Sequence, residues 1–204
     1  MDFEDFDIPT EIRNLTLPNA AELNYWNLRR NRVFWVDFEI DEYYSLIELA
    51  KEIIRINIAE KDNKNPDPII IYIHSYGGDL EQAFLFCDLC KTSYVPIVTV
   101  ATGAAMSAGL LIFLSGHRRY AFPHAQLLIH SGSAQFSGTA EQIEDAQKSY
   151  QKQIEQMKEY ILSQSSITEQ LYKKNKSRDW YVTGEDIVKL GLADKIVTNF
   201  SDIK

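Results

Sequence analysis

The sequence predicts an α/β domain built on a parallel sheet, and three observations favour this fold class. Short apolar runs such as Ile69-Ile-Ile-Tyr-Ile73 are suited to strands that are buried on both faces. These runs alternate with segments of helical periodicity, as in βαβ units. The 204 residues, of which 45% are apolar and 12% aromatic, suffice for one hydrophobic core. We therefore expect a single domain over residues 21–200, preceded by a polar, flexible tail over residues 1–20.

Strands and helices are expected to alternate along the first 130 residues. The first four segments are a strand over Arg32–Ile40, a helix over Asp41–Ile58, a charged loop over 59–68 and a strand over Ile69–Ile73. A turn at Ser75-Tyr-Gly-Gly78 then precedes a helix to Thr92, a strand from Ile97, a helix starting at Ser107 and a strand over Gln126–His130. On the first of these helices, one face carries Ile47, Ala50, Ile54 and Ile58.

A long helix is predicted over Ala140–Ser165, where apolar or aromatic residues recur every three or four positions. They are Ile143, Ala146, Tyr150, Ile154, Met157 and Ile161. A helix of this length outgrows a small domain, so it is either one more core helix or an arm that packs against another subunit. Thr183-Gly-Glu-Asp186 is typical of a capping box that opens a short helix, which Gly191 closes, and Lys195–Thr198 is the last predicted strand.

Charge and composition disfavour several functional classes. The net charge of −8, without a cluster of Lys and Arg, argues against binding to nucleic acid or to anionic membranes. The N-terminus is acidic and no apolar run approaches the ~18 residues of a membrane span, so the cytoplasm is the expected location. Cys87 and Cys90 form a C-x-x-C inside a predicted helix without a second ligand pair, which favours two buried thiols over a zinc or redox site. We expect neither a metal nor a cofactor.

The stretch Ala101-Thr-Gly-Ala-Ala-Met-Ser-Ala-Gly-Leu110 places one hydroxyl among small side chains, between a predicted strand and a predicted helix. This pattern is typical of a nucleophile elbow, where a sharp turn exposes the serine Oγ and the next N–H can face a developing oxyanion. The alternative is a tightly packed helix start with Ser107 as its N-cap. A serine nucleophile needs an imidazole base and a carboxylate that fixes the imidazole tautomer.

Of the four histidines, His130 is the best candidate for the base. It ends a predicted strand, and the carboxyl ends of parallel strands gather at one edge of a sheet, where Ser107 is also expected. His117 and His124 lie in a polar loop, and His74 would have to reach across the glycine turn, although that order remains formally possible. No acid lies between Ser107 and His130, so the Ser, acid, His order of α/β-hydrolases is excluded.

Three segments in register resemble the ClpP proteases, the proteolytic subunit of the ATP-dependent Clp system, between about Asn24 and Thr198. Gly103-Ala-Ala-Met-Ser-Ala-Gly109 is similar to the nucleophile motif of that family, and Arg119-Tyr-Ala-Phe-Pro123 with Leu127-Leu-Ile-His130 is similar to its approach to the base. Arg178-Asp-Trp-Tyr-Val-Thr183, with Glu185 and Gly191-Leu-Ala-Asp194, resembles the segment that bears its aspartate. The resemblance implies a ClpP/crotonase-type superhelix of repeated ββα units, with the helix at about 140–165 as a protruding handle.

The resemblance also implies roles for individual residues. Ser107 would be the nucleophile, His130 the general base and Asp179 the residue that orients the imidazole. Asp186 and Asp194 compete for the last role, but a capping position accounts for the first, and the second directly precedes a predicted strand.

Further expectations concern the oxyanion hole and the surface for a partner. Gly77-Gly78 matches the paired glycines of the family, so the N–H groups of Gly78 and Ala108 would bind the oxyanion; the alternative is a simple strand-to-helix turn. Tyr72 matches an aromatic residue of the docking patch, or else is a core strand residue. The chain departs from the family at Tyr76, where proline is usual, at Ala108, where methionine is usual, and after His130, where a proline and a glycine pair are missing.

The function implied is that of a serine endopeptidase, which hydrolyses peptide bonds of unfolded proteins and peptides inside a tetradecamer of two stacked heptameric rings. Because the chain has no G-x-x-x-x-G-K-[ST] motif, ATP-driven unfolding would come from a separate partner, a hexameric Clp unfoldase. Two alternatives remain open. One is a non-catalytic ClpP-like subunit that assembles or regulates, and the other is a crotonase-type acyl-CoA enzyme, which shares the backbone oxyanion hole but needs no triad.

Overall fold

The computed structural model describes residues 18–41, 46–175 and 177–203 and divides the chain into two compact units, residues 1–32 and 33–204. In the first unit, the described helix is α2 (Ala20–Arg30), which opens with a capping box between Asn19 and Glu22. The sequence analysis missed this helix, because none of its side chains is buried and its apolar pattern is weak. Most of the predicted tail over residues 1–20 lies outside the described residues.

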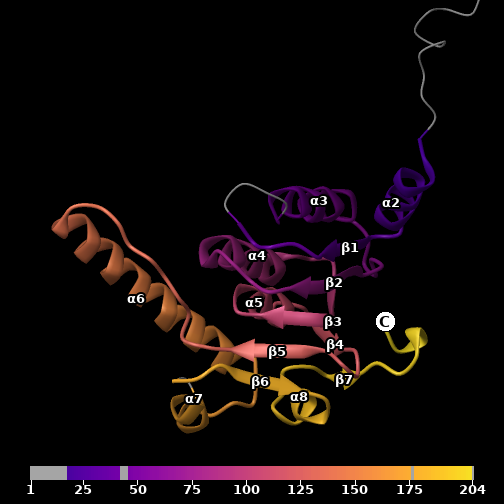
Figure 1. The fold of residues 1–204 in the computed structure, drawn as a ribbon. Coiled ribbons are helices and arrows are strands. Elements are labelled where there is room, and N and C mark those ends of the chain that lie inside the picture. The colour runs from indigo at the N-terminus through magenta and orange to yellow at the C-terminus, as the bar shows by residue number, and fades with distance from the viewer. Residues whose placement is uncertain (1–17, 42–45, 176, 204) are drawn as a thin grey trace, which may run out of the picture. The chain divides into compact units, whose positions relative to one another are not determined.

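The second unit confirms the predicted α/β fold class (Figure 1). Its parallel strands lie in the order β1 (Val33–Val36), β2 (Ile69–Ser75), β3 (Ile97–Met106), β4 (Arg118–Ala121) and β7 (Lys195–Ile196). The last residues of β3 leave β4 and pair instead with β5 (Gln126–Ile129). The strand β6 (Trp180–Thr183) pairs antiparallel with β5 and so adds one antiparallel strand to the predicted parallel sheet. The sequence analysis did not predict β4 or β6, since four residues are too few for a clear period.

Helices follow β1, β2 and β3, as expected for βαβ units. These are α3 (Leu46–Ala59), α4 (Leu80–Thr92) and α5 (Ala108–Leu114). Every residue of α5 is buried, which accounts for its purely small and apolar sequence. On α3, the buried face consists of Leu46, Leu49, Ala50, Ile53 and Ile56. The apolar stripe predicted to be buried, with Ile47, Ile54 and Ile58, is mostly exposed, because this helix carries two apolar stripes and only the other one faces the core.

The long helix is α6 (Ala140–Ser163), and only Met157 and Ile161 on it are buried. Both lie near its end, where they join the main hydrophobic core. The N-terminal part of α6 extends beyond the sheet, as Figure 1 shows. It opens with a capping box between Thr139 and Gln142. We call the part over residues 140–156 the handle.

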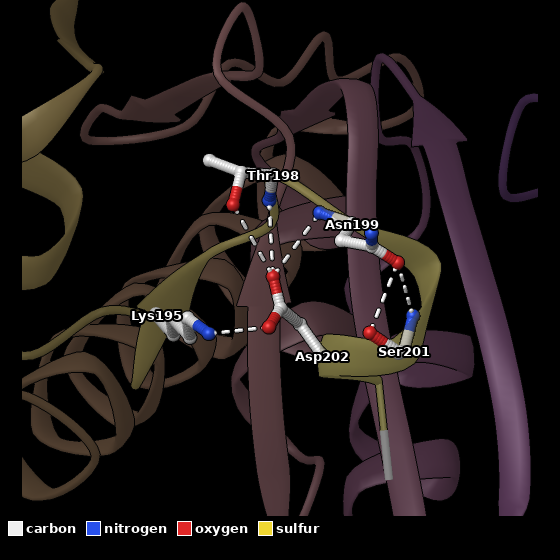
Figure 2. A network of polar contacts seen from close by, with 5 residues as sticks. All are labelled: Lys195, Thr198, Asn199, Ser201 and Asp202. Atoms are coloured by element: carbon white, nitrogen blue, oxygen red, sulfur yellow. Dashed lines mark hydrogen bonds and ion pairs between the residues drawn. The ribbon is translucent and has the colours of Figure 1, made fainter.

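The C-terminal segment contains α7 (Glu169–Asn175), α8 (Glu185–Lys189) and a 3₁₀ turn, η2 (Phe200–Asp202). The predicted capping box at Thr183 is wrong: α8 begins after Gly184, which has a φ of 56° and no side chain to cap the helix. Instead, a capping box joins Asn199 and Asp202 at η2. Figure 2 shows the carboxylate of Asp202, which accepts from the backbone N–H groups of Thr198 and Asn199 and pairs with Lys195.

Within the part of the chain that the structure describes, no helix is both long and apolar enough to cross a membrane.

Candidate active site

Ser107 occupies a strained backbone conformation between β3 and α5. Its φ of 53° and ψ of −123° lie in a region that residues with side chains rarely adopt. The neighbouring residues must be small, since a Cβ at Gly109 would lie 3.1 Å from the carbonyl oxygen of Ser75. The Ser107 N–H donates to the carbonyl of Leu128 at 3.2 Å, which ties the turn to β5. This is the geometry of a nucleophile elbow.

The imidazole of His130 lies beside the Ser107 hydroxyl, with 2.7 Å between Nε2 and Oγ. The strand register accounts for this approach, because Met106 at the end of β3 is paired with Leu128 on β5. Ser107 is the first residue after β3, and His130 is the first residue after β5. Both residues are half-buried. For Nε2 to accept the hydroxyl proton, the ring proton must be on Nδ1, which then needs an acceptor of its own.

Asp179 directly precedes β6 and is exposed. The antiparallel ladder of β5 and β6 ends with the pair Ile129 and Trp180, so His130 and Asp179 are the next residues on the two strands in the same register. Residues opposite one another in such a ladder have Cβ atoms about 5 Å apart. No hydrogen bond joins the Asp179 carboxylate to His130 in the described structure.

The two competing aspartates are engaged elsewhere. Asp186 lies on α8 and forms an exposed ion pair with Lys189, at 3.0 Å. Asp194 accepts from the backbone N–H of Arg119 at 2.7 Å and thereby joins β4 to the turn before β7. The Arg119 side chain in turn donates to the carbonyl of Gln164, beyond the end of α6. The motif around Arg119 therefore fixes the positions of elements that surround the site.

The paired glycines pack directly against the serine turn. Gly77 and Gly78 have φ values of 105° and 142°, which favour glycine. A Cβ at Gly77 would lie 2.7 Å from the Ser107 Cβ and 3.1 Å from the Ala108 nitrogen, and a Cβ at Gly78 would lie 1.8 Å from the Ile40 carbonyl oxygen. Neither the Gly78 N–H nor the Ala108 N–H has an acceptor among the described residues. Both are therefore available to a bound oxygen atom.

Ser75 is a supporting residue that the sequence analysis did not single out. It is buried, and its hydroxyl donates to the carbonyl of Phe38 at 2.6 Å and accepts from the Gly77 N–H at 3.2 Å. These bonds hold the glycine turn against the chain that follows β1. The sequence offered one indication of this role, a serine two residues before a glycine in a predicted turn. The hydroxyl of such a serine can accept a hydrogen bond from the backbone N–H two residues further along.

A cleft of about 910 Å³ opens over Ser107 and His130. One wall is the segment from His74 to Leu80, which contains the glycine turn, and the other includes Tyr150, Gln153 and Met157 of α6. Tyr76, at the position where the family usually has proline, is 71% exposed and lies on the rim.

The remaining histidines and the cysteines have other surroundings. The Nδ1 of His74 accepts from the Ala104 N–H at 3.2 Å, and that of His117 accepts from Ile97 at 2.9 Å. Cys87 and Cys90 are buried free thiols on α4, and burial raises the pKa of each to about 12, which keeps them protonated. Among the described residues, no group of three or more His, Cys, Asp and Glu side chains could hold a metal ion.

Tyr72 is half-buried on β2 and stacks on Trp35 of β1, with ring centroids 4.9 Å apart. The strand register pairs the two residues directly. Trp35 is 44% exposed. Tyr72 lies outside the main core but packs against a second, smaller cluster of buried residues that includes Val98 and Val100, so only Trp35 of the pair is exposed.

The sequence matches the Clp protease family over residues 24–200. It is 30% identical to the ATP-dependent Clp protease proteolytic subunit 2 of Treponema denticola over 76% of this chain and 79% of that protein. It is 28% identical to proteolytic subunit 1 of Corynebacterium jeikeium over 89% of this chain and 95% of the relative. For the proteolytic subunit of Deinococcus radiodurans, the identity is 24%, with coverages of 85% and 83%.

Proposed function

Since this chain belongs to the Clp protease family and is a protease, we propose that it hydrolyses peptide bonds by acyl transfer through Ser107. The observation that carries the proposal is the 2.7 Å contact between Ser107 Oγ and His130 Nε2 at a strained elbow. A serine that only capped a helix would bond a backbone N–H of that helix, and Ser107 makes no such cap bond.

In the proposed reaction, His130 accepts the hydroxyl proton as Ser107 Oγ attacks the scissile carbonyl carbon. The oxyanion that forms accepts hydrogen bonds from the N–H groups of Gly78 and Ala108, each worth about 10²–10³ in rate. His130 then gives the proton to the leaving amine, and a water molecule releases the acyl group by the reverse sequence. Asp179 accepts from Nδ1 of the imidazole, which fixes the tautomer and stabilises the imidazolium.

The proposed substrates are unfolded proteins and peptides, and the cleft of about 910 Å³ that Ser107 and His130 line supports this proposal. We further propose that the chain works in a chamber of stacked heptameric rings, fed by a separate hexameric Clp ATPase. The relatives named ATP-dependent Clp protease proteolytic subunits support this partner. The stack of the exposed Trp35 on the half-buried Tyr72 is the proposed docking surface.

Active-site labelling tests the mechanism. A fluorophosphonate reagent is expected to modify Ser107, and Ser107→Ala or His130→Ala is expected to lower peptide hydrolysis by up to about 10⁶-fold, because the triad acts as a unit. Mass spectrometry of the labelled protein locates the adduct, and circular dichroism of each variant controls for folding. Labelling at another residue, or full activity of Ser107→Ala, would falsify the mechanism.

A second measurement tests the need for an unfoldase. The protein alone is expected to degrade a short fluorogenic peptide and a permanently unfolded protein, but to leave a stably folded fluorescent protein intact. Loss of that fluorescence should require a Clp ATPase and ATP together. Degradation of the folded substrate without ATP would exclude a partner-dependent chamber.

A further inference from the structure

The hydroxyl group of Tyr150, on α6, belongs to the wall of the catalytic cleft and has no hydrogen-bond partner. Its oxygen is shielded from solvent, and no donor or acceptor among the described residues reaches it. Buried phenol groups in proteins usually have such a partner, because an unmade hydrogen bond in an apolar environment is costly. An unpaired hydroxyl in the wall of a binding cleft is therefore a candidate for contact with a ligand.

The side chain of Tyr150 separates two cavities. One is the cleft that contains Ser107, and the other, of about 360 Å³, lies between α6 and residues 131–136. Tyr150 and Gly132 line both. A Cβ at Gly132 would lie 2.4 Å from the hydroxyl, and Phe136 packs edge-on against the ring with centroids 5.8 Å apart. The ring is thus held at the boundary, with its hydroxyl beneath the chain that follows His130.

Its neighbours on the same face of α6 have no shielded oxygen or nitrogen atom that lacks a partner. Gln153 and Met157 lie one and two turns further along and also line the cleft. The amide of Gln153 already donates to Glu81 at 2.9 Å, and the thioether of Met157 is only a weak acceptor. Of these three side chains, Tyr150 alone has an oxygen or nitrogen atom that is both shielded from solvent and without a hydrogen-bond partner.

We infer that Tyr150 is a specificity-determining residue whose hydroxyl hydrogen-bonds the side-chain amide of a substrate glutamine. This glutamine is the residue whose carbonyl carbon Ser107 attacks, so the inference rests on the proposed function. Of all substrate side chains, that of this glutamine would lie nearest to Ser107. It would enter the cleft that Ser107 and Tyr150 both line. The covering residues 131–137 belong to no helix or strand, so a substrate can displace them without breaking a regular ladder.

An uncharged amide suits this position better than a charged group does. An amide and a phenol can each donate and accept, so both hydrogen-bonding functions of the hydroxyl can be used. Burial of a charge in a place shielded from solvent costs far more than burial of an amide, and the same desolvation raises the pKa of Tyr150. Asp37, Glu39 and Asp79 line the same cleft and further disfavour an acidic side chain.

Two fluorogenic peptides that differ only at this residue test the inference. One carries glutamine and the other methionine, which is similar in length but apolar. The wild-type protein is expected to show a kcat/KM about 5- to 150-fold higher for the glutamine peptide, the range that one unsatisfied polar group produces. Tyr150→Phe should remove this preference, because kcat/KM for the glutamine peptide should fall while kcat/KM for the methionine peptide stays the same.

The control variants separate recognition from folding. Tyr150→Phe deletes only an unpaired hydroxyl, so its melting temperature should equal or exceed that of the wild type. Tyr94→Phe removes a hydroxyl outside the cleft, which donates to the carbonyl of Asn63, and should leave the preference between the peptides intact. An equal loss on both peptides with a lowered melting temperature would make Tyr150 a structural residue and overturn the inference.

Fluorophosphonate labelling distinguishes failure of this inference from failure of the proposed function. If Ser107 is labelled but the wild type hydrolyses the two peptides equally, or the preference persists in Tyr150→Phe, the role of Tyr150 alone is overturned. If Ser107 is not labelled and neither peptide is cleaved, the proposed function and the inference both fall.

Discussion

Ser107 and His130 were predictable as a pair because their positions follow from local rules. A serine in a run of small residues between a strand and a helix can adopt a positive φ, and the structure gives it one of 53°. His130 ends β5, which pairs with the end of β3 in register. Parallel pairing then brings the two side chains together without any further assumption.

Asp179 is harder to assign from residues alone, because its placement depends on β6, a strand the sequence analysis did not predict. The register of β5 and β6 aligns Asp179 with His130. Tyr150 was likewise predicted only as a helix residue. Its unpaired hydroxyl depends on where residues 131–136 lie over α6, and no periodicity encodes that placement.

Substitution of Asp179 tests its proposed role as the orienting carboxylate. Asp179→Asn is expected to lower kcat on the order of 10⁴-fold, because an amide no longer favours the tautomer that accepts the Ser107 proton. The fold should persist, since the Asp179 side chain is exposed. Steady-state kinetics with a fluorogenic peptide measure the effect.

The matched control is Asp186→Asn, which removes the acid of an exposed ion pair with Lys189. Surface pairs of this kind contribute about 0–1 kcal/mol, so activity should stay close to that of the wild type. A larger loss in Asp186→Asn than in Asp179→Asn would reassign the acid.

At the scale of elements, apolar periodicity located most helices and strands but not which face of a helix is buried. On α3, two stripes are apolar, and Leu49, Ile53 and Ile56 face the core while Ile54 and Ile58 are exposed. Only the docking of the helix against the sheet decides between the stripes. At the end of the chain, apolar periodicity could not predict η2, because polar contacts hold this turn and leave no apolar pattern in the sequence.

Those polar contacts predict a pH dependence for the C-terminal segment. The ion pair with Lys195 and the hydrogen bonds from Thr198 and Asn199 lower the pKa of Asp202 from 3.8 to about 2. Because the folded-state pKa is depressed, the stabilisation is present above the unfolded-state pKa of 3.8 and is lost as the pH falls through the folded-state pKa of about 2. Asp202→Asn should therefore lower the melting temperature at pH 6, and the difference from the wild type should shrink as the pH falls below 3.8 and vanish only below pH 2.

Thermal melts of both proteins across this pH range provide the measurement. Asp62→Asn, in the exposed loop after α3, is a control that changes the same charge without these contacts. A difference between the wild type and Asp202→Asn that is constant from pH 6 to pH 2 would show that charge on Asp202 has no part in holding the segment.

At the scale of the whole molecule, the βαβ rhythm predicted a parallel sheet with Ser107 and His130 at one edge, whereas assembly depends on surfaces. Residues 140–149 of the handle are exposed apart from the half-buried Ile143. Its apolar stripe nevertheless continues through Ala146 and Ile143 towards the N-terminal end of α6. An apolar stripe beyond the core needs another surface to cover it.

The proposed cover is the handle of a facing subunit, which would join two rings and enclose the cleft. Ala146 is exposed, so Ala146→Glu should leave the fold of the subunit intact while placing a charge within the joint. Mass photometry is expected to show a double-ring particle for the wild type and a particle of half that mass for Ala146→Glu. Lys152→Glu, on the opposite face of α6, changes the net charge more than Ala146→Glu does, but it should preserve the double ring. If both variants assemble like the wild type, the handle does not join the rings and the enclosing contacts must lie elsewhere on the subunit.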